Sequence, residues 1–120
     1  MYVYAFEKLE VWKLAKDFAL SLYQLTRSFP EDEKFIMVSQ IRRSGRSIPA
    51  NIAEGSTRFS KKDQDHFYSI AYGSAIEILN DLIIATELKY INVEQLTAYR
   101  STIEQLTFKI NALRNSTQRN

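Results

Sequence analysis

The sequence contains no cysteine and only one histidine, His66. Without cysteine there is no disulfide, no thiolate metal site and no cysteine nucleophile, which suits a reducing compartment. One histidine cannot build a histidine-based metal cluster. The glycines Gly45 and Gly55 are isolated, and no P-loop, nucleophile elbow or dinucleotide-binding fingerprint is present. We therefore expect no catalytic residue, metal or cofactor, and predict that the protein is not an enzyme.

Long hydrophobic runs are also missing. The most apolar cluster, about residues 76–85, carries Glu77 and Asp81 and is shorter than the roughly 18 residues that indicate a membrane span. The first ten residues lack the basic leader and apolar run of a signal peptide. We expect a cytoplasmic protein with no membrane partner. Glu77, Asp81 and Glu54 could converge, but carboxylates one turn apart on a helix are commonly salt-bridge partners.

Three glycines and two prolines are the only strong breaks in 120 residues, and four long helical patterns lie between them. We predict helices at about residues 6–27, 31–56, 60–89 and 92–115 within a single domain spanning residues 1–120. Ser60 and Asn92 are the expected N-caps of the third and fourth helices. Short connections favour an antiparallel, up-down-up-down four-helix bundle, so the predicted fold class is all-α.

The second predicted helix combines an apolar face with a proline. Its apolar residues recur at three- to four-residue spacing and are expected to face the core; they are Phe35, Val38, Ile41, Ile48 and Ile52.

Pro49 has no backbone N–H, so the helix should kink there or break just before it. Asn51 can donate to carbonyls freed around Gly45, and Glu54 can pair with Arg58 or reach back to another arginine. We interpret Pro49, Asn51 and Glu54 as a structural clamp on a kinked helix.

Charge is distributed unevenly along the chain. Six basic residues and one acid lie between residues 41 and 62, whereas the remainder has ten basic and 13 acidic residues. A focused basic patch favours a localised anionic partner. The candidate nucleic-acid contacts are Arg42, Arg43, Arg46, Arg58, Lys61 and Lys62. The alternative is that these arginines form salt bridges within or between subunits, in a protein-interaction adaptor or structural ring.

The third predicted helix is apolar on two sides. One stripe consists of Phe67, Ala71, Ser74, Ile78, Leu82 and Ala85, and the other of Tyr68, Tyr72, Ile76, Leu79 and Ile83. A small four-helix bundle covers only one side of such a helix well. The second stripe is therefore the candidate interface of a homo-oligomer. The alternative is that neighbouring helices of the same chain cover it.

Several motifs resemble the 23S rRNA intervening-sequence proteins, a family of four-helix bundles. They are Ser39-Gln40-Ile41-Arg42-Arg43, the run from Ser47 to Gly55, Arg58, Ser60, and Phe67 with residues 70–74. The opening Phe6-Glu7-x-Leu9-x-Val11-Trp12 fits as well, so the resemblance covers about residues 6–90. Two departures are Ser44-Gly45-Arg46, after the paired arginines, and Lys89, where a glycine often precedes the tyrosine.

That family includes the accessory variability proteins of diversity-generating retroelements. The resemblance implies a homopentamer with a basic surface that binds nucleic acid, either RNA or DNA, and an interaction with a reverse transcriptase or another protein. Binding through phosphates would show little sequence specificity.

Overall fold

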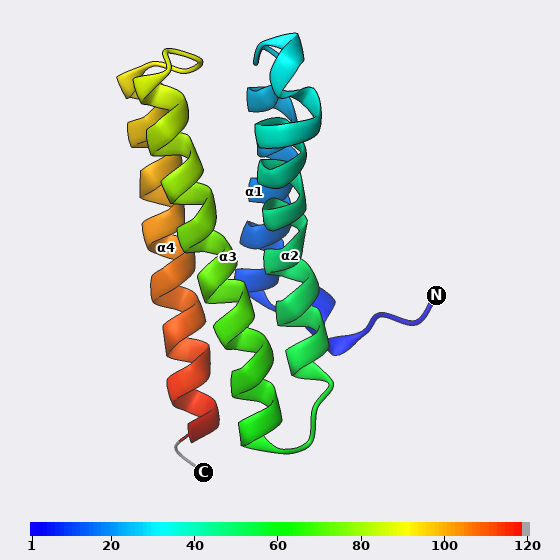
Figure 1. The fold of residues 1–120 in the computed structure, drawn as a ribbon. Helices are drawn as coiled ribbons and strands as arrows, with labels where there is room; N and C mark the ends of the chain where they lie inside the picture. Colours follow the sequence, from blue (N-terminus) through cyan, green and yellow to red (C-terminus); the bar gives the residue numbers. More distant parts are fainter. Residues whose placement is uncertain (119–120) are drawn as a thin grey trace.

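Four long helices make up most of the computed structural model, which describes residues 1–118 (Figure 1). They are α1 (Glu10–Thr26), α2 (Ser39–Ser56), α3 (Lys61–Glu87) and α4 (Val93–Gln118). A 3₁₀ turn, η1 (Ala5–Lys8), precedes α1, and a 3₁₀ turn, η2 (Glu31–Glu33), followed by a π-helical turn, η3 (Lys34–Val38), leads into α2. α1 and α3 run upward in Figure 1 and α2 and α4 downward, which confirms the antiparallel up-down-up-down bundle.

Local capping explains where the third and fourth helices begin. The Ser60 hydroxyl accepts a hydrogen bond from the backbone N–H of Asp63 at 3.1 Å. The Asn92 side chain accepts from the N–H of Gln95 at 2.8 Å, and the Gln95 side chain accepts from the N–H of Asn92 at 2.9 Å. This reciprocal capping box satisfies N–H groups that have no partner inside the helix. Both predicted caps are confirmed.

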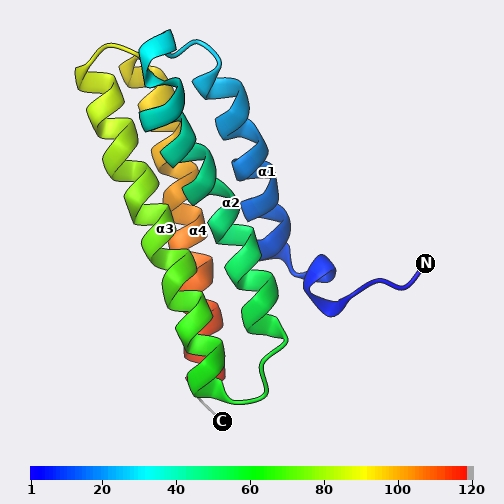
Figure 2. The ribbon, with the colours of Figure 1, turned by 45° about the vertical axis from the view of Figure 1, so that its right-hand side comes forward.

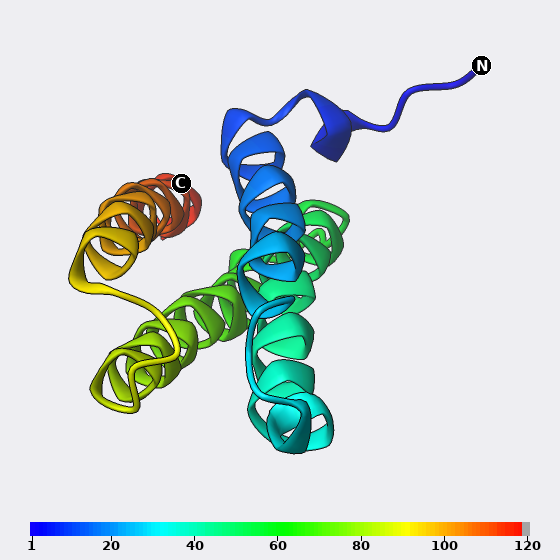
Figure 3. The ribbon, with the colours of Figure 1, turned by 90° about the horizontal axis from the view of Figure 1, so that it is seen from above.

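The core lies between helices that follow one another along the chain. α2 packs extensively against both α1 and α3, and α3 packs against α4, whereas α1 contacts α4 much less. Figure 2 shows α2 between α1 and α3, and Figure 3 shows the same series from above. The largest fully buried side chains are Leu22, Ile41, Ile48, Ile52, Ile78, Leu82, Ile103, Leu106 and Ile110. None of the helices within residues 1–118 has the length and apolarity to cross a bilayer.

Pro49 lies inside α2, and the helix continues through it to Ser56. The alternative that the helix breaks before Pro49 is therefore wrong, while a kink there stays a prediction. Asn51 donates to the backbone carbonyl of Ser47 at 2.8 Å and to its hydroxyl at 3.0 Å. The Ser74 hydroxyl of α3 donates to the Ser47 hydroxyl at 2.9 Å. Asn51 therefore links α2 to α3 through Ser47.

Replacing Pro49 with alanine is expected to leave the protein folded with unchanged helix content. Alanine suits a helix interior and restores the N–H that proline lacks. Circular dichroism and thermal unfolding, compared with the parent protein, measure this result. Loss of folding in Pro49→Ala would instead show that the proline is needed to position Ile52, Asn51 and Glu54.

One departure from the family pattern, Lys89, lies in the connection from α3 to α4. Lys89 has a φ of 66°, in the left-handed region that favours glycine. The N–H of Lys89 bonds to the carbonyl of Thr86 at 3.0 Å, and that of Tyr90 bonds to the carbonyl of Ala85 at 2.9 Å. These two bonds form a Schellman motif, which usually has glycine at this position. Lys89 therefore adopts the backbone conformation that glycine adopts most easily.

Candidate nucleic-acid interface

The six predicted nucleic-acid contacts form two groups near opposite ends of α2. The first group is Arg42, Arg43 and Arg46, and the second is Arg58, Lys61 and Lys62. The first group lies in the first two turns of α2, and the second follows its last turn. At 1.5 Å per residue, Arg46 and the end of α2 are about 15 Å apart along the helix axis. The six cations of the predicted basic patch are therefore divided into two groups along α2.

The first group lines a surface groove that also contains residues of α1 and of the π-helical turn. This basic groove has a volume of about 340 Å³. Its lining residues are Tyr23, Lys34, Phe35, Val38, Ser39, Arg42, Arg43 and Arg46. Four of the eight are cationic, and none is acidic. Because like charges gathered in a concave surface reinforce one another, the groove should attract an anion.

Phe35 is 85% exposed, so its assignment to the core-facing stripe was wrong. Phe35 lies six residues before Ile41, so even on a regular helix it is about 120° around the axis from Ile41. The two three-residue steps, from Ile41 to Val38 and from Val38 to Phe35, therefore drift away from the core-facing side. Phe35 also lies in the π-helical turn Lys34–Val38, in which each backbone hydrogen bond spans five residues instead of four and the rotation per residue changes further.

Arg42 is held in place by α1. Its Nε donates to the Thr26 hydroxyl at 2.9 Å, and its Nη2 donates to the Tyr23 carbonyl at 3.3 Å. Its guanidinium carbon lies 4.6 Å from the centroid of the Tyr23 ring, a cation–π contact. The Thr26 hydroxyl in turn donates to the carbonyl of Leu22 at 2.7 Å. Arg42 is therefore a half-buried, preoriented cation rather than a freely moving surface charge.

Arg43 and Arg46 are exposed on the outer side of α2. Nη1 of Arg43 donates to the Gln40 side-chain oxygen at 3.2 Å. Nη1 of Arg46 donates to the Tyr23 hydroxyl. Tyr23 thus contacts two of the three arginines, through its ring and its hydroxyl. No local sequence motif marks this role of Tyr23, since Tyr23 is separated from Arg46 by more than 20 residues.

The hydrogen-bond partners of these arginines are neutral. Within residues 1–118, none of the four groove cations lies at ion-pairing distance from a carboxylate. The arginine ion pairs in this part of the chain lie elsewhere, between Arg58 and Glu54 at 2.6 Å and between Arg114 and Asp65 at 2.8 Å. The positive charge of the groove is therefore not neutralised by a paired acid of the same chain. Salt bridges within the subunit were one form of the alternative hypothesis. In the described part of the chain they occur at Arg58 but not at Arg42, Arg43 or Arg46.

The second group is less suited to phosphate. Arg58 pairs with Glu54, which is one of the two kinds of partner predicted for that carboxylate. The guanidinium carbon of Arg58 lies 4.7 Å from the centroid of the Phe67 ring. Lys61 Nζ is shielded from solvent and has no hydrogen-bond partner in the described part of the chain. Of these three residues, Lys62 alone is exposed and has no salt-bridge partner among the described residues. We therefore place the candidate interface at the basic groove.

The predicted interface stripe on α3 is only partly exposed. Tyr68 is 3% exposed and belongs to the core, so its assignment to the stripe was wrong. The reason is that the ring packs against α2 at Gly55, where a Cβ atom would lie 2.6 Å from Cε1 of Tyr68. Tyr72 and Leu79 are half-buried, whereas Ile76 is 45% and Ile83 is 39% exposed.

The carboxylates considered for chemistry do not converge. Glu77 accepts a hydrogen bond from Gln40 in the first turn of α2, while Glu54 lies in the last turn of that helix. Burial raises the pKa of Asp81, a hydrogen bond from Asn80 lowers it in part, and the nearby charge of Glu77 raises it further. Among residues 1–118 no three His, Asp or Glu side chains form a group suited to a metal ion.

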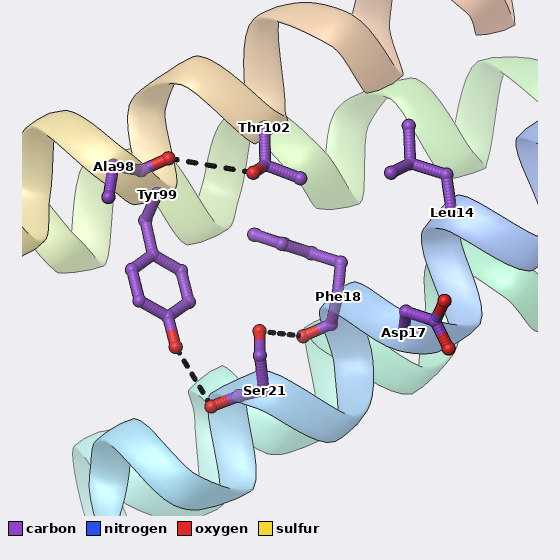
Figure 4. Close-up of a pocket in the computed structure, with 7 residues that line it drawn as sticks. All are labelled: Leu14, Asp17, Phe18, Ser21, Ala98, Tyr99 and Thr102. Atoms are coloured by element: carbon purple, nitrogen blue, oxygen red, sulfur yellow. Dashed lines mark hydrogen bonds between the residues drawn. The ribbon is translucent and has the colours of Figure 1, made fainter.

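A second groove lies between α1 and α4 (Figure 4). The Tyr99 hydroxyl donates to the carbonyl of Ser21 at 2.9 Å, and the Ser21 hydroxyl donates to the carbonyl of Phe18 at 2.6 Å. The remaining lining residues are Leu14, Asp17, Ala98 and Thr102. The Tyr99 and Ser21 hydroxyls thus donate within the chain, and the groove lacks the cationic lining of the basic groove.

Comparison with known proteins identifies relatives of this chain. The family model of the 23S rRNA-intervening sequence proteins matches residues 7–112. A crystal structure from Bacteroides thetaiotaomicron VPI-5482, described as a protein of unknown function from the S23 ribosomal protein family, is similar to this chain. The two share 27% sequence identity with a TM-score of 0.80, and the match covers 88% of this chain and 95% of that chain. No curated protein sequence matches significantly.

Proposed function

Since this chain belongs to the family of 23S rRNA-intervening sequence proteins, we propose that it is a non-enzymatic, homo-oligomeric scaffold that binds nucleic acid through the basic groove. One observation carries the binding proposal: Lys34, Arg42, Arg43 and Arg46 line one concave surface without a carboxylate among its lining residues. Phosphate oxygens are the acceptors that such a group of unpaired cations fits best.

The way the arginines are held supports phosphate binding over a purely structural role. A guanidinium that is already oriented loses less conformational entropy when it binds. Arg42 is fixed by Thr26 and Tyr23, and Arg46 is bonded to the Tyr23 hydroxyl. Each guanidinium carries five N–H donors, more than these contacts use. The arginines can therefore keep their contacts with Tyr23 and Thr26 while donating to a phosphate.

Removing two of these cations is expected to weaken binding and to flatten its salt dependence. The variant is Arg43→Ala with Arg46→Ala, which leaves the buried contacts of Arg42 intact. Each lost phosphate contact should reduce the slope of log K against log salt by about 1, so the double variant should lose about 2. Fluorescence anisotropy with labelled RNA and DNA, titrated with salt, measures both quantities.

The matched control removes two exposed cations from α4, with Arg100→Ala and Lys109→Ala. It changes the net charge by the same amount and should leave the slope close to that of the parent. Circular dichroism checks that both variants remain helical. If the parent does not bind even at low salt, or if both double variants lose binding equally, the groove is not a nucleic-acid site and the adaptor function replaces it.

The exposed part of the α3 stripe supports the oligomer. Ile76 and Ile83 lie on α3 seven residues apart, hence nearly in line along the helix, and both are more than a third exposed. The half-buried Tyr72 and Leu79 lie between and beside them, which makes the apolar strip continuous. Aligned, exposed aliphatic side chains of this kind commonly mark a protein contact.

The resemblance to a family that includes the accessory variability proteins adds detail to this proposal. As that resemblance implies a homopentamer, we propose five subunits for this chain. A ring would place several basic grooves on one particle, so weak contacts would add through avidity. A reverse transcriptase or another protein is the further partner that the same relationship suggests.

A further inference from the structure

We infer that the basic groove takes single-stranded nucleic acid, with the Phe35 ring stacking on an unpaired base while the surrounding cations hold the backbone. This inference rests on the proposed function and adds to it the class of nucleic acid. It starts from one unusual side chain: Phe35 is a large aromatic residue that is 85% exposed at the edge of a cationic surface.

Phe35 is exposed within a turn of unusual backbone geometry. Phenylalanine is usually buried, because burial removes its large apolar surface from water. In this chain Phe35 lies in the π-helical turn Lys34–Val38 and is exposed, and the neighbouring Ile36 is also 69% exposed. π-helical turns occur frequently at functional sites. The turn therefore presents an exposed ring beside the arginines.

The ring and the cations share one groove. Lys34 Nζ lies 5.5 Å from the centroid of the Phe35 ring, and Phe35 lines the same surface as Arg42, Arg43 and Arg46. An aromatic face beside a row of cations is the combination used by proteins that bind single strands, where bases stack on rings and the backbone follows the positive charge. The Tyr23 ring is covered by Arg42, which leaves Phe35 as the exposed ring of the groove.

A duplex cannot use this combination fully. Its bases are stacked on one another and present only their edges in the grooves, so a protein ring cannot lie against a base face without unstacking it. A duplex can still contact the cations through its phosphates. The groove volume of about 340 Å³ is at the lower end of small-ligand sites, which is enough for one unstacked base.

The test compares Phe35→Leu with the parent on a labelled 12-nucleotide oligo(dT), an oligo(U) of equal length and a 12-base-pair DNA duplex. Leucine keeps an apolar side chain but has no flat π face. We expect the parent to bind both single strands more tightly than the duplex. Phe35→Leu should weaken single-strand binding by about 5- to 150-fold, the range for loss of one stacked base, and leave duplex binding and both salt slopes unchanged.

Two further variants make the result specific. Phe35→Trp keeps a stacking face and should bind single strands at least as well as the parent. Phe108→Leu changes a ring that is 76% exposed on α4 and should have no effect. Unequal binding of oligo(dT) and oligo(U), which differ in the 2′-hydroxyl and in the thymine methyl group, would show which of the two strands the groove prefers. It supports the inference in either direction, provided that Phe35→Leu weakens the tighter complex.

The outcomes that overturn this inference differ from those that overturn the proposed function. If the parent binds single strands and duplex equally, and Phe35→Leu changes neither, stacking is excluded although phosphate binding stands. If Phe35→Leu lowers the mass of the assembly but not the affinity for single strands, Phe35 is a subunit contact and the inference fails. If the parent binds no nucleic acid at low salt, the proposed function fails first.

Discussion

Gly55→Ala is expected to lower the free energy of unfolding by about 1–2 kcal/mol. A Cβ atom at Gly55 would lie 2.6 Å from Cε1 and 2.9 Å from Cδ1 of Tyr68, and 3.2 Å from Cβ of Phe67. The Tyr68 ring is rigid and 3% exposed, so it cannot turn aside. Overpacking of a core costs about 1–3 kcal/mol, and the helix propensity of alanine offsets at most about 1 kcal/mol of this.

The matched control is Gly73→Ala on α3. No heavy atom lies within 4 Å of a Cβ built at Gly73, and the residue is exposed inside a helix. Alanine there should raise the free energy of unfolding by about 0.5–1 kcal/mol. Urea unfolding of both variants at one protomer concentration measures the difference, since an oligomer's stability depends on concentration. Equal shifts in the same direction would contradict the close approach of α2 and α3 at Gly55.

Ile76→Glu combined with Ile83→Glu is expected to dissociate the assembly into monomers of 14.0 kDa. Both side chains are exposed in the single chain, at 45% and 39%, so the substitutions should not disturb the core. In an assembled interface, each carboxylate would be taken out of water without a partner, at a cost of several kcal/mol per ion. Analytical ultracentrifugation or light scattering at micromolar concentration measures the mass.

Ile70→Glu provides the comparison for this experiment. Ile70 lies on the same helix and is also 39% exposed, but it is about 120° around the helix from Ile76. This variant should retain the mass of the parent assembly. A parent that is monomeric at micromolar concentration, or a double variant that keeps the parent mass, would remove the homo-oligomer from the proposed function. Tyr72→Glu is less informative because Tyr72 is half-buried and its loss could unfold the chain.

Local signals were sufficient to predict the order and type of the helices. Ser60 and Asn92 cap helices as expected because a cap depends only on residues within one turn. Glu54 pairs with Arg58 as expected for the same reason, since the two are one helical turn apart. Periodicity placed Ile41 and Ile48 in the core because α2 is regular over that range.

The failures arose where the result depends on distant residues or on helix geometry. Phe35 was misplaced because the three-residue steps from Ile41 to Val38 to Phe35 each drift about 60° around a regular helix, and the π-helical turn Lys34–Val38 changes the rotation further. Tyr68 was misplaced because periodicity locates two apolar sides on α3 but not which parts of each side the other helices cover. The role of Tyr23 depends on α1 lying beside α2, which no local pattern encodes.

The packing of successive helices has a consequence for how the chain folds. α1 pairs with α2, α2 with α3 and α3 with α4, while α1 and α4 share few contacts. The mean sequence separation between contacting residues, the contact order, is therefore low. Helical proteins of low contact order fold on the order of microseconds to milliseconds, because few long loops must close before contacts form. Each pair of successive helices can pack as soon as both helices have formed. Because the contact between α1 and α4 is weak, it can form last.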